Sequence, residues 1–237
     1  TEKYAIISAA FDDGPGSGTS KEGAVYIFEK NTDGMWGGSV SGETYRTETQ
    51  KLVPATRVAN DQFGYSVAID GDYAVISTSK NNGVKAYIFE RGANGTWSET
   101  VILKSDSEES STLYAQSVAI SGNYVIIGSK SVDSRIGAAY IYERDSNGNW
   151  GVEKSGETYR TETVQPKPND YTATTTTSWL EFGNCVAIDG DYAVVAAWYE
   201  STAVQQYGAA YIFERDSNGN WGTAVTNQTY RTETVKI

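Results

Sequence analysis

One pattern of short strands and tight turns recurs along this chain, and internal repetition of this kind constrains the fold more than any single residue does. The first strand of the pattern ends in Val-Ala-Ile, and its copies are Phe63–Ile69, Leu113–Ile120 and Phe182–Ile188. Each copy leads through a short polar turn into a second, β-branched strand; the turns are Asp70-Gly71-Asp72, Ser121-Gly122-Asn123 and Asp189-Gly190-Asp191. Glycine between two such runs is typical of a tight β-hairpin.

A third strand and a second turn complete the pattern. The third strand places small residues before aromatic ones, at Gly23–Glu29, Val84–Glu90, Gly137–Glu143 and Gly208–Glu214. The second turn is marked by Asp-Gly or Asn-Gly, and a tryptophan follows it in every unit: Trp36, Trp97, Trp150 and Trp221. Four short strands that repeat their own sequence indicate the blades of a β-propeller rather than a sandwich. We find no sustained helical periodicity, so the expected fold class is all-β.

The repeat divides one expected domain, residues 1–237, into units at about 1–62, 63–112, 113–181 and 182–237. Tyr4–Ile7 aligns with the second strand of the other units, and Tyr230–Ile237 matches the fourth strand expected at Tyr45–Leu52. The first blade is therefore expected to lack one strand. Unpaired sheet edges favour pairing, so we expect further blades or another chain to complete the assembly.

The residues of this pattern resemble a known repeat. Phe63–Ile76 reads Phe-Gly-Tyr-Ser-Val-Ala-Ile-Asp-Gly-Asp-Tyr-Ala-Val-Ile, and together with Gly-Ala-x-Tyr-Ile-Phe-Glu-Arg and Asn-Gly-x-Trp it resembles the FG-GAP repeat of integrin α-subunit-type β-propellers. The resemblance implies an extracellular or surface-exposed adhesion or recognition propeller, often with calcium in acidic loops. Turns as short as Asp70-Gly71-Asp72 cannot supply the about six to eight oxygens that calcium takes. The integrin-type calcium loop is thus not intact, the metal site is unknown, and no other cofactor is expected.

Charge and composition narrow the function. Nineteen Lys and Arg against 30 Asp and Glu give a net charge of −11, so the long-range field repels phosphate backbones and nucleic acid is not an expected partner. No apolar run approaches the ~20 residues of a membrane helix, so membrane insertion is not expected either. The chain contains no histidine, which removes the commonest general base and argues against a His-dependent hydrolase.

Two sets of repeated residues are candidate binding sites. The four tryptophans have two interpretations: packing of one blade against the next, or stacking on sugar rings with neighbouring Asn and Asp. The segment Gly-Glu-Thr-Tyr-Arg-Thr-Glu-Thr stands whole at 42–49 and 156–163 and in part at 229–234, and it presents Arg46, Arg160 and Arg231. It fits either an exposed outer strand or a repeated contact surface for a glycan or for a copy of the same protein.

The remaining candidates are acids, one thiol and two sequons. The paired carboxylates of the first turns are predicted to form the turns rather than to bind a ligand. The Asp-Ser-Asn-Gly-Asn-Trp segments at 145–150 and 216–221 are likewise predicted to be turns. Cys185 takes the place of Ser66 and Ser117 and is expected to be a small buried thiol. Asn94 and Asn227 begin glycosylation sequons.

These observations predict a non-enzymatic module for extracellular or cell-surface recognition, adhesion or structure. It would act through repeated surface sites, and several weak sites that bind together would increase the overall affinity. Its expected partners are other protein subunits or further blades of the same protein, and glycans in the alternative hypothesis. That alternative is a lectin with one weak site per blade. A propeller enzyme that uses acid pairs on sugars is the least favoured hypothesis, because no unit contributes an acid constellation of its own.

Overall fold

The computed structural model describes residues 3–14, 20–79, 85–106, 115–169, 180–201 and 206–237, and the described chain is all-β apart from the short helix α1, Val132–Arg135. Leu113 and Tyr114 of the predicted third-unit strand lie outside these residues. Within the described ranges, no helix has the length and apolar character that a membrane span requires.

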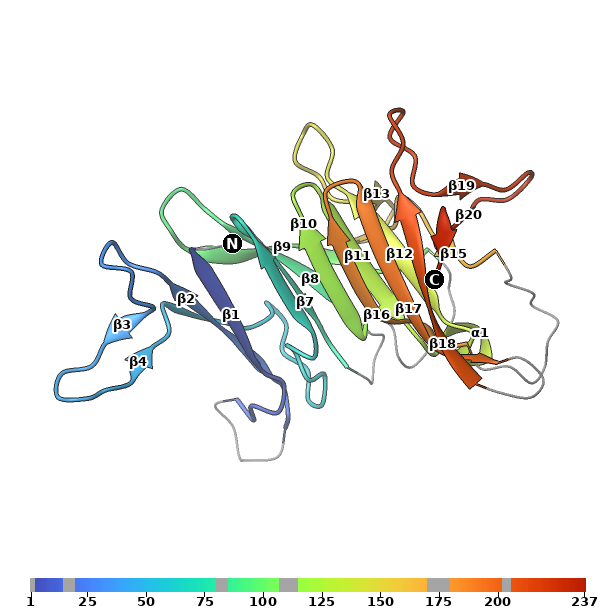
Figure 1. Ribbon diagram of the computed structural model, residues 1–237. Helices are drawn as coiled ribbons and strands as arrows, with labels where there is room; N and C mark the ends of the chain where they lie inside the picture. Colours follow the sequence, from blue (N-terminus) through green and yellow to red (C-terminus); the bar gives the residue numbers. More distant parts are fainter. Residues whose placement is uncertain (1–2, 15–19, 80–84, 107–114, 170–179, 202–205) are drawn as a thin grey trace.

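The described strands form six sheets, and four of these carry the main strands of the four repeat units and follow one another across the molecule in chain order (Figure 1). The first sheet contains β1 (Tyr4–Ala9), β2 (Ala24–Glu29) and β5 (Gln50–Leu52). The second contains β6 (Val67–Asp70), β7 (Tyr73–Ser77), β8 (Ala86–Arg91) and β9 (Trp97–Leu103), and two short strands of the third unit extend it beyond β9 to six strands. The third contains β10 (Ser117–Ser121), β11 (Tyr124–Ser129) and β12 (Ala138–Glu143), with Val164 bridged to Ile141 at its edge. The fourth contains β16 (Phe182–Asp189), β17 (Tyr192–Ser201), β18 (Gln206–Glu214) and β21 (Val235–Lys236).

The fourth strand departs from expectation in three of the four units. In the second unit β9 runs straight on from Trp97, as predicted. In the other units the chain leaves the sheet after the tryptophan, forms a separate hairpin, and returns only as a short edge segment. The hairpins are β3 (Gly38–Ser39) with β4 (Arg46–Thr47), β13 (Val152–Glu153) with β14 (Tyr159–Thr161), and β19 (Thr223–Ala224) with β20 (Arg231–Thr232). The prediction of one continuous strand at 45–52 is therefore wrong.

The first tight turn has the predicted form in the second, third and fourth units. Asp70 pairs with Tyr73 across the two-residue loop Gly71-Asp72, and Gly71 has φ 55°. Positive φ at the first central residue alone matches a type II′ turn, which follows the right-handed twist of the strands. The first sheet begins at the second-strand position, with β1 as its edge, as the alignment predicted.

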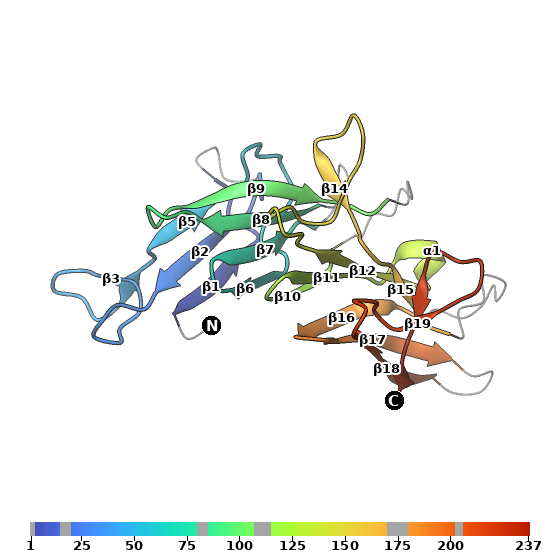
Figure 2. The same ribbon diagram turned by 90° about the horizontal axis from the view of Figure 1, so that it is seen from above.

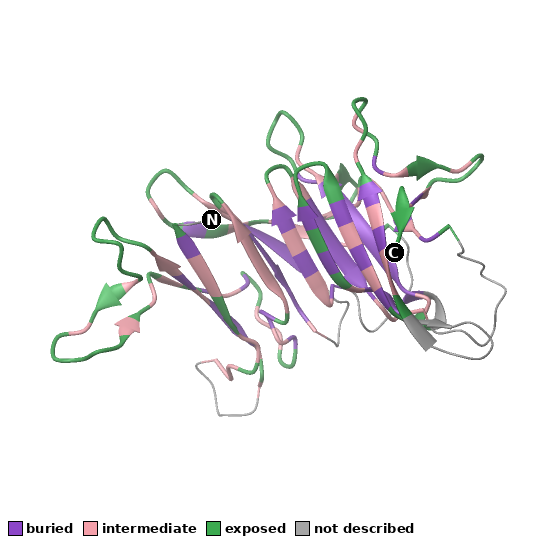
Figure 3. Cartoon of the chain, in the orientation of Figure 1, coloured by how far each residue is buried: buried purple, intermediate pink, exposed green. Residues whose placement is uncertain are grey.

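Hydrophobic cores lie between successive sheets. Side chains of β11 alternate between two of them: Val125 and Ile127 face the second sheet, whereas Ile126 faces the fourth. The first and second sheets share a third core around Phe63 and Trp97. Figure 2 shows the same succession of sheets from above, and Figure 3 shows buried residues concentrated within the sheets while the hairpins are largely exposed. Each inner sheet is thus covered on both faces, and no sheet closes on itself.

Candidate interaction surface

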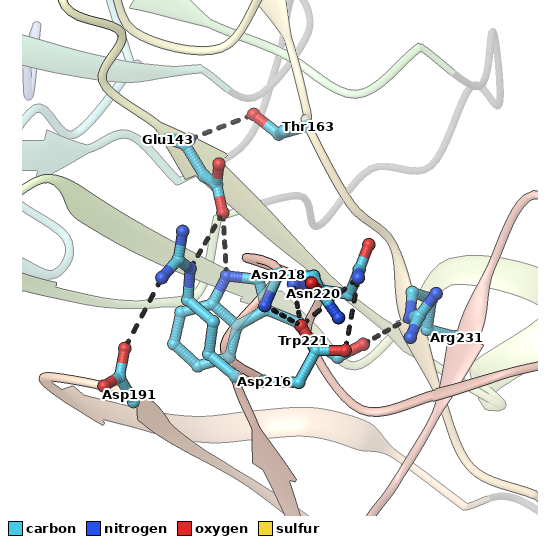
Figure 4. Close-up of polar contacts among 9 residues, drawn as sticks. Glu143, Thr163, Asp191, Asp216, Asn218, Asn220, Trp221 and Arg231 are labelled. Carbon is cyan, nitrogen blue, oxygen red and sulfur yellow. Dashed lines mark hydrogen bonds and ion pairs between the residues drawn. The ribbon is translucent and has the colours of Figure 1, made fainter.

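Three of the four predicted tryptophans, Trp97, Trp150 and Trp221, lie at the joints between neighbouring sheets. The joint between the third and fourth sheets is drawn in Figure 4. Trp221 is fully buried there, its ring lies edge-on to Tyr124 with centroids 5.3 Å apart, and its Nε1 donates to Glu143 Oε1 at 3.0 Å. The Arg215 guanidinium lies 5.0 Å from the centre of the Tyr124 ring and 3.6 Å from Glu143 Oε1. Aromatic, cation–π and charged contacts therefore combine in one place.

A tight turn positions Trp221 for this contact. Asp216 Oδ1 accepts the backbone N–H groups of Asn218 at 2.9 Å and Asn220 at 2.8 Å. The bond from the Asn220 backbone, followed by that from its side-chain amide, holds the pKa of Asp216 below its usual 3.8. Asp145 makes the same turn, and its pKa is lowered first by the Asn149 backbone bond. The prediction that these segments are turns is confirmed.

The same joint recurs between the other sheets. Trp150 lies edge-on to Tyr73 at 5.7 Å, with the Arg144 guanidinium 4.4 Å from the centre of the Tyr73 ring. Trp97 lies edge-on to Tyr4 at 5.4 Å. At that joint Arg91 contacts the Tyr4 ring and lies 3.5 Å from Glu29. Each tryptophan thus belongs to one unit, and its tyrosine partner belongs to the unit before it.

The three repeated arginines brace the hairpins from within. Arg231 Nε donates to the Trp221 carbonyl oxygen at 2.5 Å and Nη2 to the Gly222 carbonyl oxygen at 2.8 Å. Arg160 makes the equivalent bonds at 2.8 and 3.0 Å, and Arg46 at 3.0 and 2.9 Å. A planar guanidinium can reach two successive carbonyls in this way. The glycine after the tryptophan allows the close approach, since Gly222 has φ 59° and a Cβ there would lie 2.2 Å from the Thr232 carbonyl oxygen.

The hairpins of the third and fourth units lie against the outer edge of the preceding unit. β14 pairs in parallel with β9, and β20 pairs in parallel with β15 (Pro166–Lys167). A glutamate adds a bond at each edge: Glu162 Oε2 accepts the Asp106 N–H at 2.8 Å, and Glu233 Oε2 accepts the Asn169 N–H at 2.7 Å. Glu99 performs this role in the second unit, where it accepts the Ala55 N–H at 2.7 Å.

In the first unit the same tryptophan and hairpin are not covered by any other described unit. Within the described residues, hairpin β3–β4 is a separate two-stranded sheet, and Figure 1 shows it standing out at one end of the molecule. Trp36 is 37% exposed, whereas Trp97, Trp150 and Trp221 are at most 3% exposed. Met35 and Tyr45 of the same unit are also exposed.

Other predicted residues lie apart from the joints. Asn94 is exposed in a turn, where its Oδ1 accepts the Thr96 N–H at 3.0 Å, and Asn227 is exposed at φ 61°. Among the described residues, no three His, Cys, Asp or Glu side chains gather as a metal site.

The expectation that Cys185 is buried is wrong: the residue is exposed. Its counterparts Ser66 and Ser117 lie at joints, where each hydroxyl accepts a backbone N–H from the next unit, at 3.2 Å from Val118 and 3.1 Å from Val186. Cys185 lies on the outer face of the fourth sheet, which no described unit covers.

Sequence reasoning missed the partners of the tryptophans. These partners occupy three positions of each unit: the tyrosine that begins the second strand, the glutamate that ends the third strand, and the basic residue that follows this glutamate. They are Tyr4, Tyr73, Tyr124, Glu29, Glu143, Arg91, Arg144 and Arg215. Their recurrence at one position in every unit was the available signal.

Comparison with known families agrees with this repeated construction. A sequence model of the FG-GAP repeat matches residues 47–89, 97–142 and 172–213, which together make up more than half of the chain. The chain belongs to the FG-GAP repeat family. No curated protein matches it.

Proposed function

We propose that this chain is a propeller-type module of an extracellular or cell-surface protein, and that it acts by protein contact rather than by catalysis. The four sheets are the blades in this proposal. Family membership supports the class, since FG-GAP repeats typically occur in surface proteins, often in adhesion. The specific role rests on the surface itself.

The observation that carries the proposal is the exposed hairpin of the first unit. Hairpins β13–β14 and β19–β20 have the same arginine brace and lie against a neighbouring strand. Hairpin β3–β4 keeps the brace and presents Met35, Trp36 and Tyr45 to solvent. A braced hairpin that exposes aromatic side chains is suited to protein recognition, because aromatic anchors lose little conformational entropy on binding.

The acidic surface and the two exposed sequons support an extracellular setting. A net charge of −11 disfavours nucleic acid and anionic lipid as partners. Asn94 and Asn227 are both accessible for glycan attachment. We therefore place the module outside the cell, with other proteins as its partners.

The lectin hypothesis is less well supported by the geometry. Sugar stacking needs an open indole face, and three of the four tryptophans are enclosed at joints. Their arginine neighbours donate to carbonyl groups of the same unit. One exposed ring, Trp36, does not make a site per blade.

The test is photo-cross-linking in the organism that makes the protein. A benzophenone amino acid replaces exposed Tyr45 in one version and exposed Ala93, in the turn of the second unit, in the control. We expect cross-links to an extracellular protein from position 45 and none of that pattern from position 93. Equal or absent cross-linking at the two positions would contradict the proposed role of the hairpin.

A further inference from the structure

The second unit lacks the hairpin that the other three units carry. Its chain advances only two residues from Trp97 to Glu99, whereas the third unit needs twelve residues from Trp150 to Glu162. The first and fourth units have the same spacing as the third. Ten residues are therefore missing from the second unit, and they correspond to 151–160 of the third unit.

In the third and fourth units this hairpin adds a strand to the outer edge of the preceding sheet. β14 pairs in parallel with β9 (Figure 2), and the Lys104 N–H donates to the Arg160 carbonyl oxygen at 3.0 Å. β20 pairs in the same way with β15, and the Arg231 N–H donates to the Gln165 carbonyl oxygen at 3.2 Å. Each covered edge thus offers one backbone donor and one backbone acceptor to the hairpin.

The outer edge of the first sheet faces the second unit and receives no such strand. Among the described residues, β5 is the last strand of that sheet. The glutamate bond aligns this edge with the covered ones, because the N–H of Ala55 donates to Glu99 as those of Asp106 and Asn169 donate to their own glutamates. Lys51 therefore holds the position of the backbone acceptor, and Val53 holds the position of the backbone donor.

The pairing of β5 with β2 turns these two backbone groups outward. In the fourth unit Ile237, at the position of Leu52, exchanges bonds of 2.8 and 2.9 Å with Ala210 of the neighbouring strand. Leu52 is paired with β2 at the equivalent residue. Backbone groups alternate in direction along a strand, so the Lys51 carbonyl and the Val53 N–H face away from β2. No described residue accepts the Val53 N–H.

A glutamine replaces the missing hairpin in one respect only. Where the hairpin is present, its arginine donates to the carbonyl oxygen of the tryptophan, as Arg160 does. In the second unit Gln50 Nε2 donates to the Trp97 carbonyl oxygen at 2.8 Å, and its Oε1 accepts the Trp97 N–H at 2.9 Å. The tryptophan is thus held without a hairpin, while the backbone of the β5 edge stays uncovered. This edge lies between two described units and not at an end of the chain.

We propose that the outer edge of β5, from Lys51 to Val53, binds an extended segment of a partner protein that supplies the missing parallel strand. Addition of a strand to an exposed sheet edge is a common mode of peptide recognition. Elsewhere the covering hairpin comes from the following unit, but here the following unit continues directly from Trp97 into β9. Pro54 does not prevent pairing, because Pro168 stands at the same position of the covered edge in the third unit.

The side chains at this edge define the chemistry of the partner segment. On the covered edges a lysine ammonium lies over the hairpin tyrosine, with Lys104 4.3 Å from the centre of the Tyr159 ring and Lys167 5.1 Å from that of Tyr230. Half-buried Val53 takes the place of these lysines. The partner segment is therefore extended, carries an aromatic or aliphatic side chain against Val53, and has no proline where its N–H must donate. The site uses no residue of hairpin β3–β4 and adds a second protein contact to the proposed function.

Amide hydrogen exchange, followed by NMR of the full chain, first tests whether the edge is free. Without any partner, the Val53 N–H should exchange at least about 10-fold faster than the Lys104 N–H, which a strand covers. Equally slow exchange at the two amides would show that the chain itself covers the edge, and would overturn the inference.

The probe for binding is a synthetic peptide with the sequence of residues 151–160, acetylated and amidated, which is the segment that the second unit lacks. We expect saturable changes in the amide signals of Lys51 and Val53, with a Kd of about 1 mM. The peptide should also slow exchange of the Val53 N–H by about 10-fold at saturation.

Two altered peptides test the backbone pairing. Arg160→Ala in the peptide should bind with similar affinity, because Gln50 already holds the Trp97 carbonyl. Arg160→Pro should weaken binding by at least about 10-fold, because proline lacks the N–H that donates to the Lys51 carbonyl.

An insertion variant fills the edge from within the chain. The same ten residues, placed between Trp97 and Ser98, should abolish peptide binding, whereas ten alternating Gly and Ser residues at that point should leave it intact. The titration of the unaltered chain remains decisive if either insertion prevents folding.

Three results of the titrations would contradict the proposal. They are an absence of saturable change at Val53 up to about 10 mM peptide, equal affinity of the Ala and Pro peptides, and undiminished binding to a folded chain that carries the hairpin insertion. Cross-linking from position 45 is independent of these results, so the proposed role of hairpin β3–β4 can stand or fall separately.

Discussion

The turn before each tryptophan depends on one side-chain acceptor, and the units differ in whether that acceptor carries charge. Asn31 Oδ1 accepts the N–H groups of Asp33 at 3.0 Å and Met35 at 2.9 Å in the first unit. Asp145 and Asp216 accept the equivalent bonds in the third and fourth units. An amide oxygen therefore builds the same turn, but a carboxylate makes the turn sensitive to acid.

We expect the double variant Asp145→Asn, Asp216→Asn to keep its fold and lose part of its acid sensitivity. The pKa of each Asp is lowered in the folded protein, chiefly by the backbone bonds from Asn149 and Asn220. A lowered folded pKa gives stability that is present above the unfolded value of 3.8 and is lost as the pH falls through the folded value. The melting temperature of the wild type minus that of the variant should thus decrease as the pH is lowered from neutral.

Thermal unfolding of both proteins across this pH range measures the difference. Asp33→Asn serves as the control, because Asp33 contributes only its backbone N–H to the bonds of the first-unit turn. A difference between wild type and double variant that stays constant with pH would show that the two carboxylates do not support the turns through charge.

The residue types predicted the turns, but they could not predict which side chains at equivalent positions of different units are exposed. Cys185 has the small side chain that its joint position requires, and Ser66 and Ser117 at that position accept bonds from a neighbouring unit. Burial there depends on whether another unit covers the sheet face. Nothing in the residue itself carries that information, so the prediction of a buried thiol failed.

At the scale of the element, the repeated hairpin is the feature that the sequence described least well. Alternating Thr, Tyr, Arg and Glu fits an edge strand and a projecting hairpin equally, because both expose side chains to water and pair along one edge only. What decides between them is the arginine, which reaches back to the Trp-Gly carbonyls of its own unit. A contact between residues ten apart is not encoded in strand periodicity.

We expect Arg160→Lys to destabilise the protein by about 1–2 kcal/mol. The guanidinium donates from Nε and Nη2 to two successive carbonyls, and a lysine ammonium cannot reproduce this fork. Urea unfolding, followed by tryptophan fluorescence, measures the loss.

Glu153→Gln provides the matched control for this variant. It removes only the exposed ion pair with Arg160 Nη1 at 3.8 Å and should cost less than about 0.5 kcal/mol. If Arg160→Lys costs no more than Glu153→Gln, the two carbonyl bonds contribute no stability beyond what a positive charge alone supplies.

At the scale of the whole molecule, stability is distributed over cores that lie between units rather than within them. Each inner sheet contributes its two faces to two different cores, as the alternation of Val125, Ile126 and Ile127 shows. Such an array gains stability from contacts between neighbours. The repeat pattern predicted this stacking, and it could not predict which faces lack a neighbour, because that is a property of the assembled chain.

Two valines at the same register position provide the sharpest check of this arrangement. Val75 of the second sheet is fully buried against the third unit, whereas Val194 of the fourth sheet is half-buried on the open face. In dilute protein, Val75→Ala should cost about 2 kcal/mol through lost burial and an internal cavity. Val194→Ala should cost less than about 1 kcal/mol, because water already reaches the side chain. Chemical unfolding of both variants at low protein concentration measures the contrast. Equal losses would mean that the face around Val194 is covered in solution and that Val194 is buried as Val75 is.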